Sequence, residues 1–518
     1  MNTPRIAVIG AGIGGLSAAL MLAAKGAHVR VFERAAHVGG KAREDMVGGA
    51  AIDVGPTVLT MRHVFEALFE CAGTRLETHI TLDPLCELAR HVWPDGSRLD
   101  LFQDTERSKD AIGAFAGPGE AEGFARFTQD AQAAFEVLDE RFMRYPRPSM
   151  ARLFKNATLA EFLAASPVPT YARKLKSYFR DPRLHQLFAR YTTYCGASPY
   201  RAPATLMLVA YAELMGVWRV RGGMAKLPQA IAALVENAGG EIRLGTGVSE
   251  IKTEAGRVSG LRLETGEEIA ADAVVLNGDV NALASGLLGS LQGHHVKRVS
   301  PGARSYSALT WALNGPVSGF PLAHHNVAFG ANYRLEFKDI ARYGLPRDPT
   351  IYICRQTSHE ENDQHDGNER LFLIVNAAAR GDTGGPAPEE IERCETQVKQ
   401  RLSSAGLQIN WSKTESLRTT PAMFANRFPG SGGALYGRAN HHLLANFLRP
   451  GQRTKLPGLY LAGGSAHPAP GMPMASLSGQ MAAQCLIEDW ASMRRSHPVV
   501  IAGGMSTPSA TTGPSRSV

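Results

Sequence analysis

Cysteine is scarce in this chain, and the few cysteines are far apart. The 518 residues include six cysteines, and no two of them form a C-x-x-C pair. The sixteen histidines likewise show no H-E-x-x-H or comparable ligand spacing. Zinc sites, iron–sulfur clusters and disulfide frameworks need clustered ligands, so we expect no bound metal. Scattered free thiols are typical of a reducing cytosol.

Long apolar runs are also absent. No stretch approaches the roughly 20 apolar residues that span a bilayer, and the mean hydropathy is −0.14. The sequence shows no Ser/His/Asp or Cys/His arrangement for nucleophilic catalysis, and no internal repeat. A net charge of +7 comes without an RNA- or DNA-binding signature, so we expect no nucleic acid partner. At this length we expect two or more domains.

The positive charge is concentrated in one segment, residues 141–190. Eleven Arg or Lys residues stand there against two acids. Aromatic residues are interleaved with them, among them Phe154, Phe162, Tyr171, Tyr178, Phe179 and Phe188. Such a stretch is typical either of a solvated helical face or of a surface that lies on an anionic membrane. Of the functional readings, we favour peripheral binding to a membrane.

The first motif is a glycine-rich turn. Gly10-Ala11-Gly12-Ile13-Gly14-Gly15 follows the apolar run Arg5–Ile9 and precedes the helical pattern Leu16–Ala24. Glycines allow the tight turn and the close approach of a pyrophosphate, which the helix N-terminus then faces. A second strand, His28–Phe32, ends in Glu33, whose carboxylate suits a free ribose 2′-hydroxyl. This pattern predicts a βαβ dinucleotide site.

The rest of the nucleotide unit is divided along the chain. We expect a discontinuous Rossmann-like domain in residues 1–75, 222–295 and 441–495. Residues 76–221 and 296–440 then form an inserted α+β domain for substrate and membrane, and residues 496–518 a disordered tail. The expected fold class is α/β. We expect a loop over Val38–Gly55 and helices over Lys226–Asn237, Pro388–Ser404 and Ser476–Met493. Strands are expected in a small meander over Val248–Thr253, Gly256–Thr265 and Glu268–Leu276, and further strands over Tyr306–Leu313, Pro349–Cys354 and Arg370–Asn376.

Two further stretches carry a resemblance. Glu33 with Gly39-Gly40-Lys41 resembles the FAD fingerprint of the glutathione-reductase-like, amine-oxidase and phytoene-desaturase superfamily. The segment 456–479, LPGLYLAGGSAHPAPGMPMASLSG, is similar to the signature of bacterial-type carotenoid desaturases. Amine oxidases typically have glutamate where Ser465 stands. The sequence departs from the common H-P-G-x-G at Ala469 and Pro470, so we carry over no backbone contact at position 469.

The resemblance implies a set of FAD-binding residues. His467 is included as a flavin-site residue and not as a proton shuttle, because an orienting bond to backbone explains it equally well. Asp279 is as consistent with a turn as with a functional acid, so we assign no catalytic residue. The expected cofactor site comprises Gly10, Gly12, Ile13, Gly14, Gly15, Glu33, Arg34, Gly40, Lys41, Ala42, Gly55, Pro56, Val248, Gly463, Gly464, Ser465, His467, Gly471 and Met472.

One branch of the family is indicated more specifically. Phe188–Pro203 and Thr419–Arg438 resemble the 1-hydroxycarotenoid desaturases. That branch implies hydride transfer from an acyclic 1-hydroxy or 1-methoxy carotenoid to flavin N5, which introduces a C-3,4 double bond. The alternatives are a phytoene desaturase acting on unhydroxylated carotenes, a non-redox FAD-dependent isomerase, and a binding protein that retains FAD. Oxygen or a quinone would accept the electrons. We expect a peripheral protein on the cytoplasmic side of a bacterial membrane.

Overall fold

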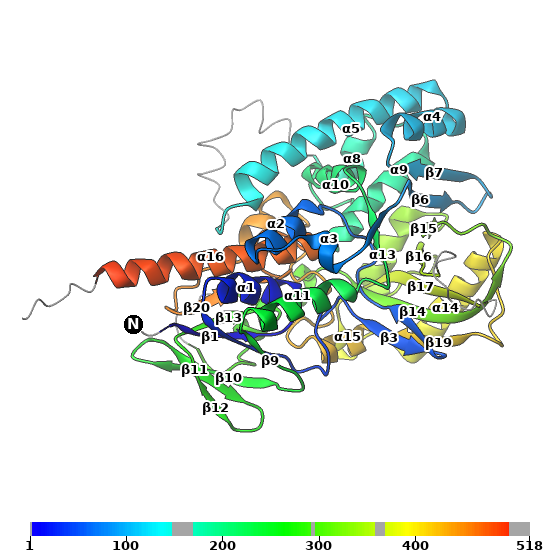
Figure 1. The fold of residues 1–518 in the computed structure, drawn as a ribbon. Coiled ribbons are helices and arrows are strands. Elements are labelled where there is room, and N and C mark those ends of the chain that lie inside the picture. The colour runs from blue at the N-terminus through cyan, green and yellow to red at the C-terminus, as the bar shows by residue number, and fades with distance from the viewer. Residues whose placement is uncertain (1–2, 148–168, 292–295, 358–367, 497–518) are drawn as a thin grey trace, which may run out of the picture.

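The computed structural model describes residues 3–147, 169–291, 296–357 and 368–496. Its first unit is a parallel five-stranded sheet (Figure 1). Short apolar runs form these strands because both faces of the sheet are covered. In order across the sheet, the strands are β20 (Leu459–Leu461), β13 (Ala273–Leu276), β1 (Arg5–Ile9), β2 (His28–Phe32) and β9 (Glu241–Arg243).

Helices cover one face of this sheet, and a small sheet covers the other. On the first face, α1 (Ile13–Ala24) packs against α11 (Lys226–Asn237) and α16 (Met472–Ser496). On the second face, the antiparallel strands β10 (Val248–Glu254), β11 (Arg257–Leu263) and β12 (Glu268–Ala270) form a separate core with β1 and β13. Every strand of these two sheets comes from residues 1–75, 222–295 or 441–495.

The second unit is built on an eight-stranded sheet. Its helix α14 (Pro388–Ser404) packs on that sheet through a core of apolar side chains, and lies at its outer side in Figure 1. The strands are β18 (Gln408–Ile409), β14 (Ser307–Ser318), β17 (Asn368–Ala377), β16 (Ile351–Arg355), β15 (His325–Ala328), β6 (Glu87–Val92) and β7 (Arg98–Phe102), with β19 (Glu415–Thr419) paired to β14.

A helical layer lies beside the β6–β7 end of this sheet and shares a core with it. It contains α4 (Thr105–Ala116), α5 (Pro118–Leu138), α8 (Tyr171–Leu175), α9 (Pro182–Ala189), α10 (Leu208–Leu214) and the turns η1 (Asp139–Met143), η2 (Arg190–Cys195) and η3 (Ala204–Met207). The remaining elements are α2 (His63–Cys71), α3 (Leu76–His79), β3 (Glu44–Val47), β4 (Ala50–Asp53), β5 (Leu82–Pro84), β8 (Trp218–Val220), α12 (Val280–Ala284), η4 (Pro301–Ala303), α13 (Tyr333–Tyr343), η5 (Gly381–Thr383), α15 (Pro421–Arg427) and η6 (Leu443–Leu448).

Most of the expected elements are confirmed, with three differences. The expected loop Val38–Gly55 contains the hairpin β3–β4. The expected strand Glu268–Leu276 is divided between β12 and β13, which lie in different sheets. The last helix begins at Met472, four positions before the expected start. The expected tail lies almost wholly outside the described residues.

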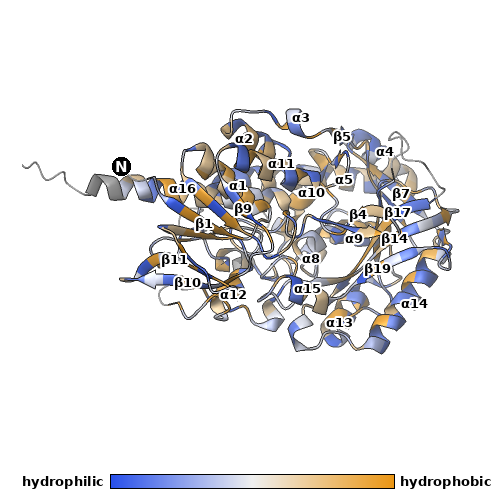
Figure 2. Ribbon diagram, turned by 60° about the horizontal axis from the view of Figure 1, so that its bottom comes forward, coloured by the Kyte–Doolittle hydropathy of each residue, from blue (hydrophilic) through white to orange (hydrophobic). Residues whose placement is uncertain are grey.

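Figure 2 shows the strands of the first sheet as mainly apolar, whereas α14 mixes apolar and polar residues, as its partial burial requires.

Four aromatic residues of the basic segment are covered by protein. Tyr171, Tyr178, Phe179 and Phe188 are all buried in the core of the helical layer. Phe154 and Phe162 lie outside the described residues. The apolar area of these four side chains is covered by protein, so they belong to the core, and peripheral binding by the rest of the segment stays a prediction.

Candidate functional site

One large cavity of about 990 Å³ joins the two units. Its wall is mostly apolar and begins at the glycine-rich turn before α1. It continues past the loop before β3, the loop after β4 and the loop before α16, and it ends among strands of the eight-stranded sheet. Ligand pockets are commonly about 300–1,000 Å³, so this cavity is large enough for a cofactor with part of a substrate.

The glycine-rich turn is closely packed from behind. A Cβ at Gly15 would lie 2.1 Å from the carbonyl oxygen of Gly10. At Gly14 it would lie 2.8 Å from the backbone nitrogen of Gly463. The side chain of Asn277 fills the space beneath the turn and donates to the Gly10 carbonyl at 3.2 Å. Only glycine therefore allows α1 to begin here with its N-terminus at the cavity.

Glu33 is held by backbone where β2 ends. Its carboxylate accepts hydrogen bonds from the backbone N–H groups of Ala11 at 2.7 Å and Ala35 at 2.8 Å. A carboxylate has about four acceptor positions, so two are left for a ligand. Glu33 also lines the cavity. It can accept hydrogen bonds from a ribose, as expected from the position of this carboxylate after the second strand.

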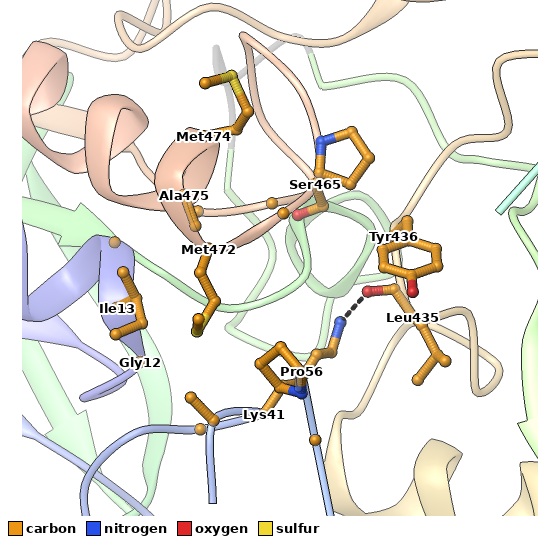
Figure 3. Close-up of a pocket in the computed structure, with 18 of the residues that line it drawn as sticks. Gly12, Ile13, Lys41, Pro56, Leu435, Tyr436, Ser465, Met472, Met474 and Ala475 are labelled. Atoms are coloured by element: carbon orange, nitrogen blue, oxygen red, sulfur yellow. Dashed lines mark hydrogen bonds between the residues drawn. The ribbon is translucent and has the colours of Figure 1, made fainter. Parts of the chain in front are cut away.

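Lys41 enters the cavity from the loop after β2. Figure 3 shows its ammonium bonded to the carbonyl oxygen of Leu435. Burial lowers the pKa of Lys41, and the carboxylate of Asp279 opposes that shift. Burial likewise raises the pKa of Asp279. These two residues place ionisable groups of opposite sign in the mostly apolar wall.

Asp279 also has a structural role. Its carboxylate accepts a hydrogen bond from the backbone N–H of Asn281 at 2.9 Å and so caps the start of α12. Ser465 supports the same region, because its Oγ accepts from the backbone N–H of Val280 at 3.0 Å. These contacts agree with the expectation that Asp279 forms a turn. The residue also lines the cavity.

The loop between β20 and α16 is held by a residue that the sequence analysis missed. The Arg449 guanidinium is 2% exposed and donates hydrogen bonds to the carbonyls of Gly464, Tyr436 and Arg438 at 2.8–2.9 Å. It thereby fixes the loop against the opposite wall. The first residues of α16, from Met472, also line the cavity. A helix N-terminus with unpaired N–H groups stabilises negative charge at that point.

His467 is buried behind the wall. Its Nε2 is 3.1 Å from the carbonyl oxygen of Phe142, and its ring stacks edge-on against the Phe142 ring. Burial lowers its pKa to about 4. A neutral histidine in this position ties the loop to η1 and does not reach the cavity. These contacts agree with the alternative in which His467 orients the loop through a hydrogen bond to backbone.

The structure brings nearly all the expected cofactor residues to one cavity. Gly15 and His467 do not line it, since they pack behind it. Residues that do line it are Gly10, Gly12, Ile13, Gly14, Glu33, Arg34, Gly40, Lys41, Ala42, Gly55, Pro56, Val248, Gly463, Gly464, Ser465, Gly471 and Met472.

The cavity continues beyond these residues into the second unit. Both segments that resemble the hydroxycarotenoid branch contribute to its wall, for example through Tyr194 and Tyr436. The sheet adds side chains that the sequence did not single out, among them Thr310, Tyr352 and Asn376. A ligand in this part would extend away from the glycine-rich turn along the sheet.

Comparison with known proteins identifies the family. A family model described as "Flavin containing amine oxidoreductase" matches residues 13–487. This chain belongs to the flavin containing amine oxidoreductase family. The backbone N–H groups before α1, the free acceptor positions of Glu33 and the N-terminus of α16 all fit a flavin dinucleotide, so the cofactor of this oxidoreductase is FAD. Bound FAD supplies a two-electron acceptor.

Relatives place this oxidoreductase in the carotenoid desaturase branch. A hydroxyneurosporene desaturase of Rubrivivax gelatinosus is 48% identical over 518 residues, covering 99% of each chain. Another from Cereibacter sphaeroides is 42% identical, over 95% of this chain and 99% of the relative. A 4,4′-diapolycopene oxygenase of Methylomonas sp is 30% identical, over 94% and 99%.

Solved structures share the fold of this oxidoreductase. Cyclohexylamine oxidase from Brevibacterium oxydans has a TM-score of 0.57 at 18% identity, covering 95% of this chain and all of that one. An oxidoreductase from Methanosarcina mazei also gives 0.57, at 16% identity, over 93% and 100%. Within the described part of the chain, no helix is long and apolar enough to cross a membrane.

Proposed function

We propose that this oxidoreductase desaturates the C-3,4 bond of an acyclic 1-hydroxy carotenoid such as 1-hydroxyneurosporene, or of its 1-methoxy counterpart. The observation that carries the proposal is the 48% identity to a hydroxyneurosporene desaturase over the whole chain. The large, mostly apolar cavity that continues from the FAD residues supports it, because a polyene needs an apolar wall.

The two units would divide the work. Residues 1–75, 222–295 and 441–495 hold FAD through the cavity-lining members of the expected site, and residues 76–221 and 296–440 hold the substrate. The protein has to place the allylic carbons beside the flavin and to exclude water. Because this chemistry needs mainly positioning of the substrate, it does not require a catalytic nucleophile. Oxygen or a quinone would take the electrons away.

Membrane association belongs to the same proposal. A polyene has negligible solubility in water, so the substrate has to arrive from lipid. We place the protein at the cytoplasmic side of a bacterial membrane, bound peripherally. Apolar residues near α5 and η1, including Phe135, Phe142 and Met474, form a cluster at the cavity wall. This cluster suits an entrance for the polyene substrate.

The test is turnover by the purified holoenzyme with substrate in liposomes. 1-Hydroxyneurosporene and phytoene are offered separately, with oxygen or a quinone, and the polyene absorption bands are recorded. We expect a red shift with the hydroxylated substrate, because one double bond joins the conjugated system. A shift with phytoene alone would contradict the proposal and favour an early desaturase.

A further inference from the structure

One buried ion pair interrupts the apolar wall of the cavity. Arg190 and Glu213 both line it, and their side chains are only 6% and 4% exposed. Arg190 Nη2 lies 3.7 Å from Glu213 Oε1. Taking two charges out of water is costly, and hydrophobic residues in their place are often at least as stabilising. The pair therefore needs an explanation other than stability.

The pair has hydrogen-bonding capacity left over. Glu213 accepts from the hydroxyls of Tyr191 at 2.8 Å and Tyr194 at 2.9 Å, and Arg190 Nη1 donates to the Tyr194 hydroxyl at 2.5 Å. Nε and Nη2 of Arg190 have no hydrogen-bond partner among the described residues. A carboxylate has about four acceptor positions. The pair can thus donate to an oxygen and accept from its hydrogen at the same time.

Other buried polar groups near Arg190 also lack partners. In the described part of the chain, Nε2 of His91, Nε2 of His325 and the hydroxyl of Tyr171 have none. Burial, and after it the charge of Arg190, lowers the pKa of His91 well below its usual range. The pKa of His325 is also lowered well below its usual range, first by burial and then by the nearby His324 and Arg190. None of these three groups lines the cavity, so they make the surroundings of Arg190 polar from behind the wall.

This polar region adjoins a loop of the cofactor site. Thr57 follows Pro56 directly, and its hydroxyl is 2.6 Å from that of Tyr352, which also lines the cavity. The Tyr352 hydroxyl is in turn 2.7 Å from Nδ1 of His325, the ring affected by Arg190. In a 1-hydroxy substrate, only C-2 separates the hydroxyl-bearing carbon from C-3. A substrate that reacts at C-3,4 must therefore place its hydroxyl close to the flavin.

We propose that Arg190 and Glu213 bind the tertiary hydroxyl of the substrate, with Arg190 donating to its oxygen and Glu213 accepting its hydrogen. This inference rests on the proposed function and makes the pair a specificity determinant. An unhydroxylated chain end would leave the spare donors and acceptors of both residues without partners. A site built to bond a hydroxyl rejects the analogue that lacks it much more strongly than an apolar pocket rejects a missing methylene.

The test compares 1-hydroxyneurosporene with neurosporene in the holoenzyme and in the variant Arg190→Met/Glu213→Gln. Replacing both charges avoids a stranded charge, and glutamine keeps an acceptor for the tyrosine hydroxyls. We expect the ratio of kcat/KM for the hydroxylated substrate to that for neurosporene to fall by about 10- to 100-fold. The control Arg90→Met/Asp100→Asn removes a 2.8 Å pair outside the cavity wall and should leave the ratio unchanged.

If the double variant loses its flavin, two single variants test whether the Arg190–Glu213 pair binds the substrate hydroxyl. Tyr194→Phe and Tyr191→Phe each remove one hydroxyl that donates to Glu213, but only Tyr194 lines the cavity and contacts Arg190 through its hydroxyl. We expect a reduced ratio, with a raised KM for the hydroxylated substrate, in Tyr194→Phe alone.

Two results would overturn the inference. An unchanged ratio in a flavin-loaded Arg190→Met/Glu213→Gln variant, or equal ratios in the two tyrosine variants, means that the pair binds only water or supports the fold. The proposed function is then untouched, provided that the wild type converts 1-hydroxyneurosporene. A wild type that converts neither polyene overturns the proposed function and this inference with it.

Discussion

His467 and Arg449 act on the same loop at the edge of the cavity, although only His467 stands out in the sequence. His467 lies in the stretch that resembles carotenoid desaturases, yet its ring is fully buried and bonded to the Phe142 carbonyl. Arg449 carries no motif and still bonds three carbonyls in the loop and its neighbours. Backbone carbonyls give no signal in a sequence, so such an arginine could not be predicted.

The burial of His467 predicts an acid-sensitive contribution to stability. Its pKa is about 4 in the folded protein and about 6.5 in the unfolded chain. Between these values the unfolded chain binds a proton that the native state does not. The contribution is therefore complete above a pH of about 6.5 and is lost as the pH falls through 4.

His467→Gln tests this contribution. The amide nitrogen of glutamine takes the place of Nε2, so it can still donate to the Phe142 carbonyl, but it does not titrate. We expect the free energy of unfolding, measured with urea at several pH values, to depend less on pH between about 4 and 6.5 in the variant than in the wild type. The same pH dependence in both proteins would contradict the assignment of a buried, neutral ring.

Among the elements, α1 and α16 form the contact on which the cofactor end depends. Ser17 and Ser476 share a buried hydrogen bond of 2.9 Å between their hydroxyls. A Cβ at Gly479 would lie 1.9 Å from the carbonyl oxygen of Gly14. The two helices thus touch through backbone next to the glycine-rich turn, and the position of one helix determines that of the other.

Gly479→Ala should separate these helices. Overpacking typically costs about 1–3 kcal/mol, and here it also displaces the start of α1 from the cavity. We expect a lower midpoint in thermal unfolding and less FAD bound per protein. Gly119→Ala in α5 is the matched control, because its Cβ would meet nothing within 4 Å. Equal flavin content in the two variants would argue against this role of the contact.

The elements also show how far the sequence alone could lead. The helices Lys226–Asn237 and Pro388–Ser404 have the predicted bounds, since their apolar pattern is complete within each segment. The pairing of β6 with β15 was not predictable, because its partners, such as Arg90 and Asn326, are far apart in the chain. In the same way, the glycines of the cofactor site follow from local backbone needs, whereas the buried partnership of Arg190 with Glu213 depends on tertiary packing.

At the scale of the whole molecule, two units of different architecture share one cavity. The parallel sheet provides helix and strand ends for the cofactor, and the eight-stranded sheet with its helical layer provides the wall beyond (Figure 1). Each unit receives separate stretches of the chain, so the site is complete only when distant segments assemble. This arrangement would allow a long apolar substrate to lie against a buried cofactor, as the proposed desaturation needs.

Anaerobic reduction tests that central claim most directly. The oxidised holoenzyme is mixed without oxygen or quinone with liposomes that contain 1-hydroxyneurosporene, and the visible absorption of the flavin and the polyene is followed together. We predict loss of the oxidised flavin bands with a red shift of the polyene, in one-to-one amounts. Flavin that stays oxidised while the polyene is unchanged would contradict a desaturase acting on this substrate.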